Sequence, residues 1–197
     1  KNIKAAQNKL ERAGELEYNV YTEWRDIEPQ LERYRELESR SWKSAEGVDI
    51  AKTPEYYKFH QDLAMVFSAD GQYVMRILTL DGKPVAGTFG IVVNDVFWSL
   101  HIVHDEQWSR ASPGTYLEYL EIKDCFEQGL RKYEFLGGFL NNKKRWARNF
   151  RQSRELRVYR RSGVLPMIYL AYFVAKPWLR NSQRLIKKSL AAASTVA

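Results

Sequence analysis

Three apolar runs in the middle of the chain constrain its fold more than any other feature. The runs Tyr73–Leu80, Pro84–Val93 and Val96–Val103 are rich in Val, Ile, Phe, Tyr and Thr, which favour strands. Asp81-Gly82 separates the first two runs, and Asn94-Asp95 separates the second and third. Because Asp-Gly between two apolar runs is a strong hairpin signal, we predict an antiparallel meander of three strands.

Helical patterns flank this meander on both sides. Asp26 is placed to cap a helix, and Thr53-Pro54 and Ser112-Pro113 each combine a capping residue with Pro at the first helical position. Leu16–Thr22 and Tyr133–Leu136 have the pattern of strands. A meander followed by a strand–helix–strand crossover predicts an α+β domain, in which helices pack on a mixed sheet.

The charge of the chain is distributed unevenly. The 197 residues carry a net charge of +7, but residues 1–139 carry −6, residues 140–161 carry +8 and residues 162–197 carry +5. A basic strip can follow nucleic-acid phosphates, yet no aromatic stacking motif or recognition helix accompanies this one. Nucleic-acid binding is therefore the least favoured function. The single cysteine, Cys125, excludes a disulfide framework and a multi-cysteine metal site.

The C-terminal third adds aromatic residues to its positive charge. Leu165–Leu190 interleaves Tyr, Phe and Trp with five Lys or Arg residues, a mixture that suits an anionic membrane interface. A helix docked on the domain's own core, followed by a solvated basic tail, explains the same pattern. The longest apolar run, Val164–Ala175, is shorter than the ~20 residues of a membrane-spanning helix. We predict a last strand at Leu156–Arg161 and helix from Pro166 onward.

The clearest candidate binding site is Ser109–Thr115, which joins a strand to a helix. Ser112-Pro113 is suited to begin the helix, and Gly114 lets another stretch of backbone approach closely. Free N–H groups at residues 114–116 and the positive end of the helix dipole predict an anion site for phosphate or pyrophosphate. An ordinary capped helix is the alternative. The residues assigned to this site are Arg110, Ser112, Pro113, Gly114 and Thr115.

Two further groups of residues suggest chemistry. Gly137–Trp146 combines two glycines with amides, cations and Trp, which suits a polar, anionic or sugar-like ligand, and a solvated basic loop is the alternative. His101 and His104 are spaced to lie on opposite faces of a strand, which argues against a shared metal, and we expect none. His104 with Asp105 is a candidate acid–base element, although a structural histidine explains the pattern as well.

Five segments in a fixed order cover about residues 30–161. They are Arg40-Ser41-Trp42, Tyr57–Ala64, Leu80–Ala86, Asp105–Gly114, and Phe135–Gly138 followed by Lys143 and Trp146. Together they resemble the acetyltransferase family associated with bacterial cellulose biosynthesis, a GNAT-fold family related to the Fem-type peptidoglycan aminoacyltransferases. The chain departs from that family at Asn141 and Asn142, where the family often has an acidic residue and Tyr.

The resemblance implies a GNAT-like fold with a mixed, mostly antiparallel sheet and helices packed on both faces. Proteins of this resemblance often carry two GNAT-like halves, and this chain resembles the second. Residues 1–25 would then be a joint to a preceding half, residues 26–163 the acyltransferase domain and residues 164–197 a basic aromatic helical tail.

The resemblance also implies an acyltransferase. The acyl group would move from a phosphopantetheine thioester, as acyl-CoA or acyl carrier protein, to an amine or hydroxyl acceptor in cell-envelope or exopolysaccharide synthesis. The donor's phosphates would bind at the start of the helix after Ser112, and the thioester would lie between two splayed strands, Val96–Val103 and Tyr133–Leu136. His104, helped by Asp105, is the predicted base. The residues assigned to the acceptor side are Trp108, Gly138, Asn142, Lys143, Arg145 and Trp146.

Two other functions remain open from the sequence. The domain can be a catalytically silent GNAT-like module that binds envelope-synthesis proteins or an anionic membrane surface through residues 164–197. It can also transfer an aminoacyl group from aminoacyl-tRNA, as Fem-type enzymes do. All three functions predict a cytoplasmic protein, and the second also places it at the inner membrane face.

Overall fold

The computed structural model describes residues 2–46, 50, 53–137, 143–147, 156, 167 and 169–175. The chain divides into two compact units, Lys1–Ala147 and Arg148–Ala197. In the second unit Leu170–Ala175 forms a short π-helix. Apart from Leu156, the predicted strand Leu156–Arg161 lies outside the described residues.

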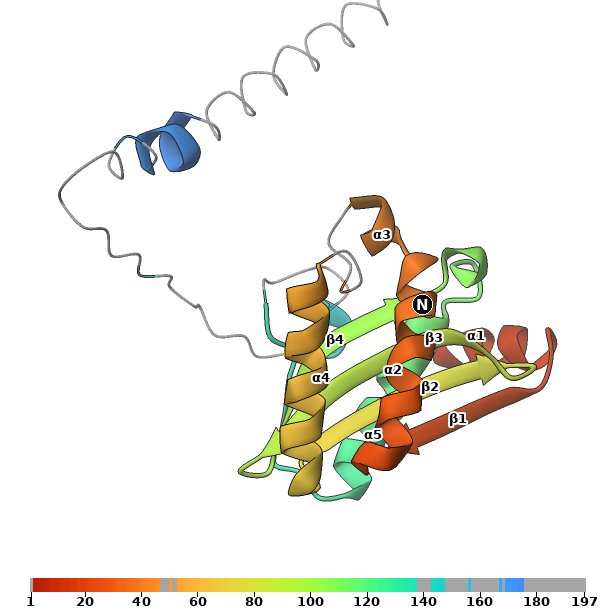
Figure 1. Cartoon of the computed structure of the whole chain (residues 1–197). Helices are drawn as coiled ribbons and strands as arrows, with labels where there is room; N and C mark the ends of the chain where they lie inside the picture. Colours follow the sequence, from red (N-terminus) through yellow and green to blue (C-terminus); the bar gives the residue numbers. More distant parts are fainter. Residues whose placement is uncertain are drawn as a thin grey trace, which may run out of the picture. The chain divides into compact units, whose positions relative to one another are not determined.

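The first unit is built on one five-stranded sheet (Figure 1). Its strands run in the order β1 (Leu16–Tyr21), β2 (Tyr73–Leu80), β3 (Lys83–Val93), β4 (Val96–His104) and β5 (Lys132–Glu134). The first four strands are antiparallel neighbours, and β5 lies parallel to β4. The predicted fold class, a mixed and mostly antiparallel sheet with helices, is confirmed.

The two predicted hairpin turns are formed as expected. Asp81 and Gly82 have φ values of 49° and 75°, and Asn94 and Asp95 have φ values of 52° and 59°. Positive φ at both central residues is the geometry of the type I′ turn, whose twist matches that of the flanking strands. Because Asn, Asp and Gly tolerate this region best, the turns are fixed by the local sequence alone.

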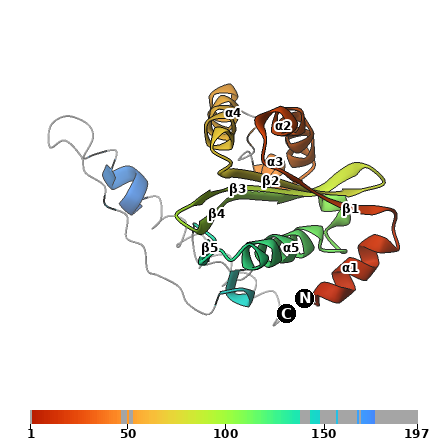
Figure 2. The same cartoon turned by 90° about the horizontal axis from the view of Figure 1, so that it is seen from below.

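Helices cover both faces of the sheet (Figure 2). The helices of this unit are α1 (Ile3–Glu11), α2 (Trp24–Ser39), α3 (Trp42–Glu46), α4 (Pro54–Ala69) and α5 (Pro113–Glu127). On one face, α2 and α4 bury Leu31, Leu37 and Ala64 against Met75 and Ile77 of β2. On the other face, α1 and α5 pack against alternate residues of the same strands. Two cores therefore sandwich the sheet, with apolar side chains pointing to each.

The helix starts differ in detail from the sequence prediction. Helix α2 begins at Trp24 with Glu23 as its N-cap, so Asp26 lies in the first turn rather than at the cap. Its carboxylate is still favoured there by the positive end of the helix dipole. Helix α4 begins at Pro54 as predicted, but the side chain of the N-cap Thr53 makes no capping hydrogen bond.

The N-terminal segment is an integral part of the first unit. Strand β1 pairs with β2 from Leu16↔Leu80 to Tyr21↔Met75, and α1 contributes Ala6 and Leu10 to the core shared with α5. This core is interrupted if residues 1–25 are removed. Among the described residues no helix combines the length and the apolar character needed to cross a membrane.

Candidate acyl-transfer site

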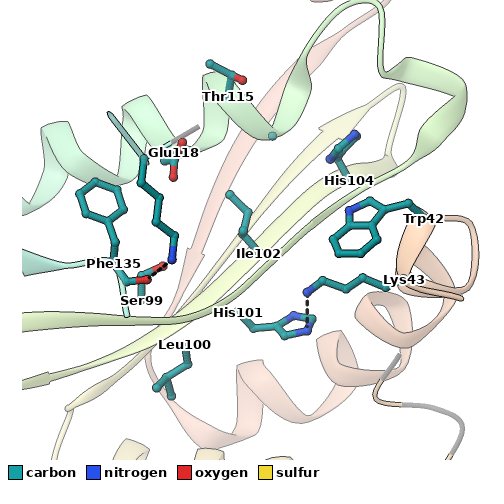
Figure 3. Close-up of a pocket in the computed structure, with 12 residues that line it drawn as sticks. Trp42, Lys43, Ser99, Leu100, His101, Ile102, His104, Thr115, Glu118 and Phe135 are labelled. Carbon is teal, nitrogen blue, oxygen red and sulfur yellow. Dashed lines mark hydrogen bonds between the residues drawn. The ribbon is translucent and has the colours of Figure 1, made fainter. Parts of the chain in front are cut away.

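A cavity of about 370 Å³ lies where β5 parts from β4 (Figure 3). The two strands pair only from Val96↔Lys132 to Trp98↔Glu134. Beyond that point Ser99 and Ile102 of β4 and Phe135, which follows β5, line the cavity. Strand β5 is shorter than the predicted Tyr133–Leu136 and is paired with β4 over its whole length, so the cavity lies along the part of β4 that continues past the end of β5.

A β-bulge shapes the cavity wall in β4. Phe89 is opposite His101, whereas the next residue, Gly90, is opposite Ser99, so Leu100 is an extra residue in the ladder. A bulge bends its strand and leaves the extra residue unpaired in the ladder. Leu100 packs against the core under α2 and α4. The bend coincides with the place where β4 leaves β5.

The two histidines of β4 lie on opposite faces, as their spacing predicted. The His101 ring lies on the α2 face, where its Nδ1 is 2.7 Å from the hydroxyl of Tyr34. His104 lies on the α5 face, where a Cβ added at Gly114 would come within 3.2 Å of its Nδ1. Both histidines line the cavity, together with Trp42 and Lys43 on one side and Thr115 and Glu118 on the other. The cavity is therefore bounded by residues from both faces of the sheet.

The start of α5 leaves fewer free backbone amides than the sequence predicted. Ser112 adopts a left-handed conformation with φ 62°, and its carbonyl accepts hydrogen bonds from the amides of Thr115 (3.1 Å) and Tyr116 (3.2 Å). The Ser112 hydroxyl lies 3.5 Å from the carbonyl of Ser109 and does not cap the helix. Of the three amides that were expected to be free, only that of Gly114 has no acceptor among the described residues. Pro113 is buried.

The predicted partner of His104 is engaged elsewhere. The buried carboxylate of Asp105 accepts hydrogen bonds from Arg40 Nε (2.7 Å) and from the amide of Gln107 (2.9 Å). The carboxylate beside His104 is that of Glu106, with Oε1 3.5 Å from His104 Nε2. Asp105 thus fixes the chain after β4, a role that the adjacent sequence positions did not reveal.

The residues assigned to the acceptor side do not all lie together. Trp108 packs against the core formed by α1 and α5. Arg110, which the sequence assigns to the donor site, is exposed. Residues 143–146 fold back onto α5. Gly138 and Asn142 lie outside the described residues.

Four hydrogen bonds hold this returning segment in place. Arg145 Nη1 donates to Thr115 Oγ1 at 3.2 Å, and Trp146 Nε1 donates to Glu118 Oε2 at 2.5 Å. Lys143 Nζ donates to the carbonyls of Phe135 and Leu136. The two predicted clusters therefore meet beside one cavity, which Lys143 lines, while Arg145 and Trp146 contact the cavity-lining residues Thr115 and Glu118.

Burial shifts the pKa values of two side chains that line the cavity. It raises the pKa of Glu118, although the hydrogen bond from Trp146 and the charges of Arg145 and Lys143 act to lower it. It lowers the pKa of Lys143, although the charges of Glu118 and Glu134 act to raise it. Both side chains have protein partners. Among the described residues no cluster of His, Cys, Asp and Glu is suited to hold a metal ion.

Comparison with known proteins agrees with this architecture. A family model described as an acetyltransferase (GNAT) domain matches residues 1–161. The chain belongs to the GNAT acetyltransferase family. No curated protein matches the sequence.

Solved structures share the fold of this GNAT domain. An aminoglycoside acetyltransferase, meta-AAC0020, from an uncultured soil metagenomic sample in complex with sisomicin is 13% identical, with a TM-score of 0.51 over 75% of this chain and 97% of that chain. A possible acetyltransferase from Clostridium difficile 630 is 12% identical, with a TM-score of 0.51 over 74% and 99%. AAC(6')-Iy in complex with the bisubstrate analogue CoA-S-monomethyl-acetylneamine is 13% identical, with a TM-score of 0.50 over 76% and 100%. At these identities the likeness shows the fold.

The GNAT domain also contains a polar cluster that the sequence did not indicate. On the α2 face of the cavity, His101 Nε2 lies 2.6 Å from Lys43 Nζ and 3.1 Å from Glu38 Oε1. Glu38 is fully buried, and its other oxygen accepts the amide of Ile50 at 2.8 Å. The cluster joins α2, α3 and β4, which are far apart in sequence. Neither the spacing nor the local pattern of these residues distinguishes them from ordinary surface and core positions.

The environment of this cluster perturbs its titration. Burial lowers the pKa of Lys43 to about 8, although the charge of Glu38 opposes the shift. Burial also lowers the pKa of His101, although the nearby Glu38 carboxylate opposes the shift. For Glu38, burial alone would raise the pKa, but the neighbouring His101, the Ile50 amide and the charge of Lys43 together lower it.

Proposed function

We propose that this GNAT domain transfers an acyl group from a phosphopantetheine thioester to an amine or hydroxyl acceptor. The proposal rests on the cavity beside β4, beyond the end of its pairing with β5. Residues from both faces of the sheet line this cavity. A reaction between two substrates needs a site that each can enter without blocking the other. The α5 face would take the donor and the α2–α3 face the acceptor.

The residues on the α5 face fit a phosphate-bearing donor. Gly114 lies at the positive end of the α5 dipole, and its amide has no acceptor among the described residues. A side chain at this position would meet His104, so glycine keeps the space between α5 and β4 open. The thioester arm of acyl-CoA or an acyl carrier protein would lie along Ser99–Ile102.

The chemistry follows from positioning and from one backbone donor. The thioester supplies an acyl carbon with a thiolate leaving group. In the proposed reaction a backbone N–H at the Leu100 bulge stabilises the negative charge that develops on the carbonyl oxygen. The cavity walls hold the acceptor atom against the acyl carbon, which replaces a bimolecular encounter by a local one. His104, the base predicted from sequence, lies beside Gly114 on the donor side, where we propose that it contacts the donor.

The acceptor and the pathway are proposed from the sequence resemblance. It favours an amine or sugar hydroxyl in cell-envelope or exopolysaccharide synthesis, and aminoacyl transfer of the Fem type is the alternative donor chemistry. Lys143, Arg145 and Trp146 support this side of the cavity through their contacts with α5 and β5. The proposed membrane or partner surface at residues 164–197 falls almost entirely outside the described residues.

Thermal-shift measurements with CoA and acetyl-CoA test the donor assignment. We expect both to stabilise the wild-type protein and expect Gly114→Leu to abolish the shift, since the leucine would fill the space beside His104. Lys123→Leu, an exposed position on the same helix outside the cavity, is the control and should respond like wild type. If neither compound stabilises the wild type, the donor class is wrong. If Gly114→Leu responds normally, the placement of the donor is wrong.

A further inference from the structure

The cluster on the α2–α3 side of the cavity has the geometry of a proton acceptor. Lys43 lines the cavity and points at His101, and a hydrogen bond joins the two side chains (Figure 3). His101 is 11% exposed and Glu38 is fully buried, so one end of the cluster faces the cavity and the other lies in the core. An ion pair that only tied α3 to the sheet would not require the amine to face the cavity.

We propose that Lys43 is the base that takes the proton of the acceptor, with His101 as the residue that positions it. The proposal rests on the acyl transfer proposed above and names the group that performs its proton-transfer step. It assigns this step to the face of the sheet opposite His104. The acceptor therefore meets its base on the side from which we propose that it enters.

The proposal requires one tautomer of the neutral His101 ring. In it, Nε2 accepts from Lys43 Nζ at 2.6 Å, and the Nδ1 proton is donated to the oxygen of Tyr34 at 2.7 Å. Glu38 Oε1, 3.1 Å from the same Nε2, then receives no hydrogen bond from the ring. The Tyr34 hydroxyl in turn lies 3.4 Å from the carbonyl of Gly87 and donates to it. With the ring held in this tautomer, one N–H of Lys43 stays directed at His101. The lone pair of the neutral amine is then left available for another proton.

The protonation state of Lys43 suits this role. General bases act best when their pKa lies near the working pH, and burial brings the pKa of Lys43 to about 8. The same burial lowers the pKa of His60, which faces the cluster from α4, to about 4, so that this ring adds no positive charge. The titratable groups that face Lys43 and His101 are Tyr34 and Glu38 from α2 and His60 from α4, with Glu118 and Lys143 across the cavity.

The step balances without an additional reactant. The acceptor nitrogen or oxygen forms a bond to the acyl carbon, and its proton moves to the lone pair of Lys43 Nζ. The C–S bond of the thioester breaks, and its electron pair leaves on the sulfur as a thiolate. Lys43 then releases the proton, and the thiolate takes up one proton from solvent. The net reaction is acceptor plus thioester to acylated acceptor plus thiol.

The first experiment measures the titration of Lys43 without turnover. The whole protein is trace-labelled with acetic anhydride across a pH series, and mass spectrometry of the digest gives the reactivity of each lysine. We expect Lys43 to show a midpoint near 8, whereas Lys58, an exposed lysine on α4, serves as the reference in the same digest. If the two lysines follow the same curve, Lys43 carries no perturbed amine and the proposal is overturned.

The second experiment measures the pH profile of turnover. Thiol release from acetyl-CoA is followed with a panel of small amines and sugar alcohols as acceptors. For wild type we expect kcat to rise with pH through an inflection near 8, as Lys43 loses its proton. Lys43→Met should lower kcat by roughly a hundredfold and remove the inflection, with little change in the KM for acetyl-CoA. Lys58→Met is the matched control and should keep the wild-type profile.

Three further variants separate the proposed role of Lys43 from those of His101 and His104. Lys43→Arg keeps a cation but supplies no base, so it should behave like Lys43→Met. His101→Gln should lower kcat and move the inflection, whereas His104→Gln should retain it. Turnover by wild type with an unaltered profile in Lys43→Met overturns the base assignment alone. Absence of thiol release by wild type with every acceptor refutes the acyl-transfer proposal and the base assignment with it.

Discussion

A buried arginine in the centre of the sheet gives the sharpest stability prediction. Arg76 of β2 is 1% exposed, and its guanidinium lies 3.2 Å from Glu121 and 3.3 Å from Asp124, both on α5. Glu121 is fully buried and also accepts hydrogen bonds from Thr88 Oγ1 at 3.2 Å and Tyr133 Oη at 2.5 Å. This network joins β2, β3 and β5 to α5, so it fixes two walls of the cavity.

We predict that Arg76→Met lowers the free energy of unfolding by about 3–5 kcal/mol at pH 8, because it leaves a buried carboxylate without its counter-charge. Methionine keeps much of the apolar volume beside Phe97, whose ring centre is 5.0 Å from the guanidinium carbon. The free energy of unfolding of a domain is typically about 5–15 kcal/mol, so the variant should still fold.

The loss should depend on pH with a definite sign. Burial raises the pKa of Glu121 from 4.5 to about 7 in spite of the opposing charge of Arg76, and removing Arg76 raises it further. A raised pKa in the folded state gives stability that is present below the unfolded pKa and is lost as the pH rises through the folded value. The difference in free energy of unfolding between the variant and the wild type should therefore be small near pH 5 and increase above pH 7.

Urea unfolding monitored by tryptophan fluorescence at pH 5 and pH 8 measures the loss of stability and its dependence on pH. The control Arg35→Met removes a half-exposed arginine whose bridge to Glu32 is on the surface, and it should change stability by roughly 0–1 kcal/mol at either pH. Arg76→Met with Glu121→Gln should recover part of the loss at pH 8, since no buried ionised Glu121 remains. A loss below about 1 kcal/mol at pH 8, or one equal at both pH values, would refute this reasoning.

Two smaller perturbations are predicted from individual contacts. Gly87→Ala would place a Cβ 2.7 Å from Cε2 of the buried Tyr34. We therefore expect the free energy of unfolding in the same urea assay to fall by about 1–3 kcal/mol. An unchanged urea midpoint would show that the ring can move. Trp146→Phe removes the indole N–H from Glu118, so the pKa of Glu118 should rise further; carboxyl NMR titration measures it, and a fall would contradict the assigned hydrogen bond.

The strands and most helix starts were predictable because they depend on local geometry. The turns at Asp81-Gly82 and Asn94-Asp95 require positive φ, and these residue types tolerate it wherever they occur. The runs of β-branched and aromatic residues between these turns then placed β2, β3 and β4 to within one residue at each end. The alternation of side chains along a strand put His101 and His104 on opposite faces, since both follow the bulge at Leu100.

Local sequence was a poorer guide where a residue's partner lies far along the chain. Asp105 stands next to His104 in sequence, but its charge is satisfied by Arg40, which α2 brings to the end of β4. This difference arises because buried polar groups find partners in three dimensions. At the start of α5 the reason is local, since the carbonyl of the N-cap Ser112 accepts the amides of Thr115 and Tyr116, which were expected to remain free.

The sequence by itself determined the strands, the helix-initiating positions and the glycine at the start of α5, since these depend on backbone torsions and on periodicity. Only the tertiary structure decided where charges meet. Lys43, His101 and Glu38 become a cluster because the α2–α3 turn packs over the bulged strand, and burial there sets the protonation state of the amine. Desolvation depends on what surrounds a group, and no single stretch of sequence contains those surroundings.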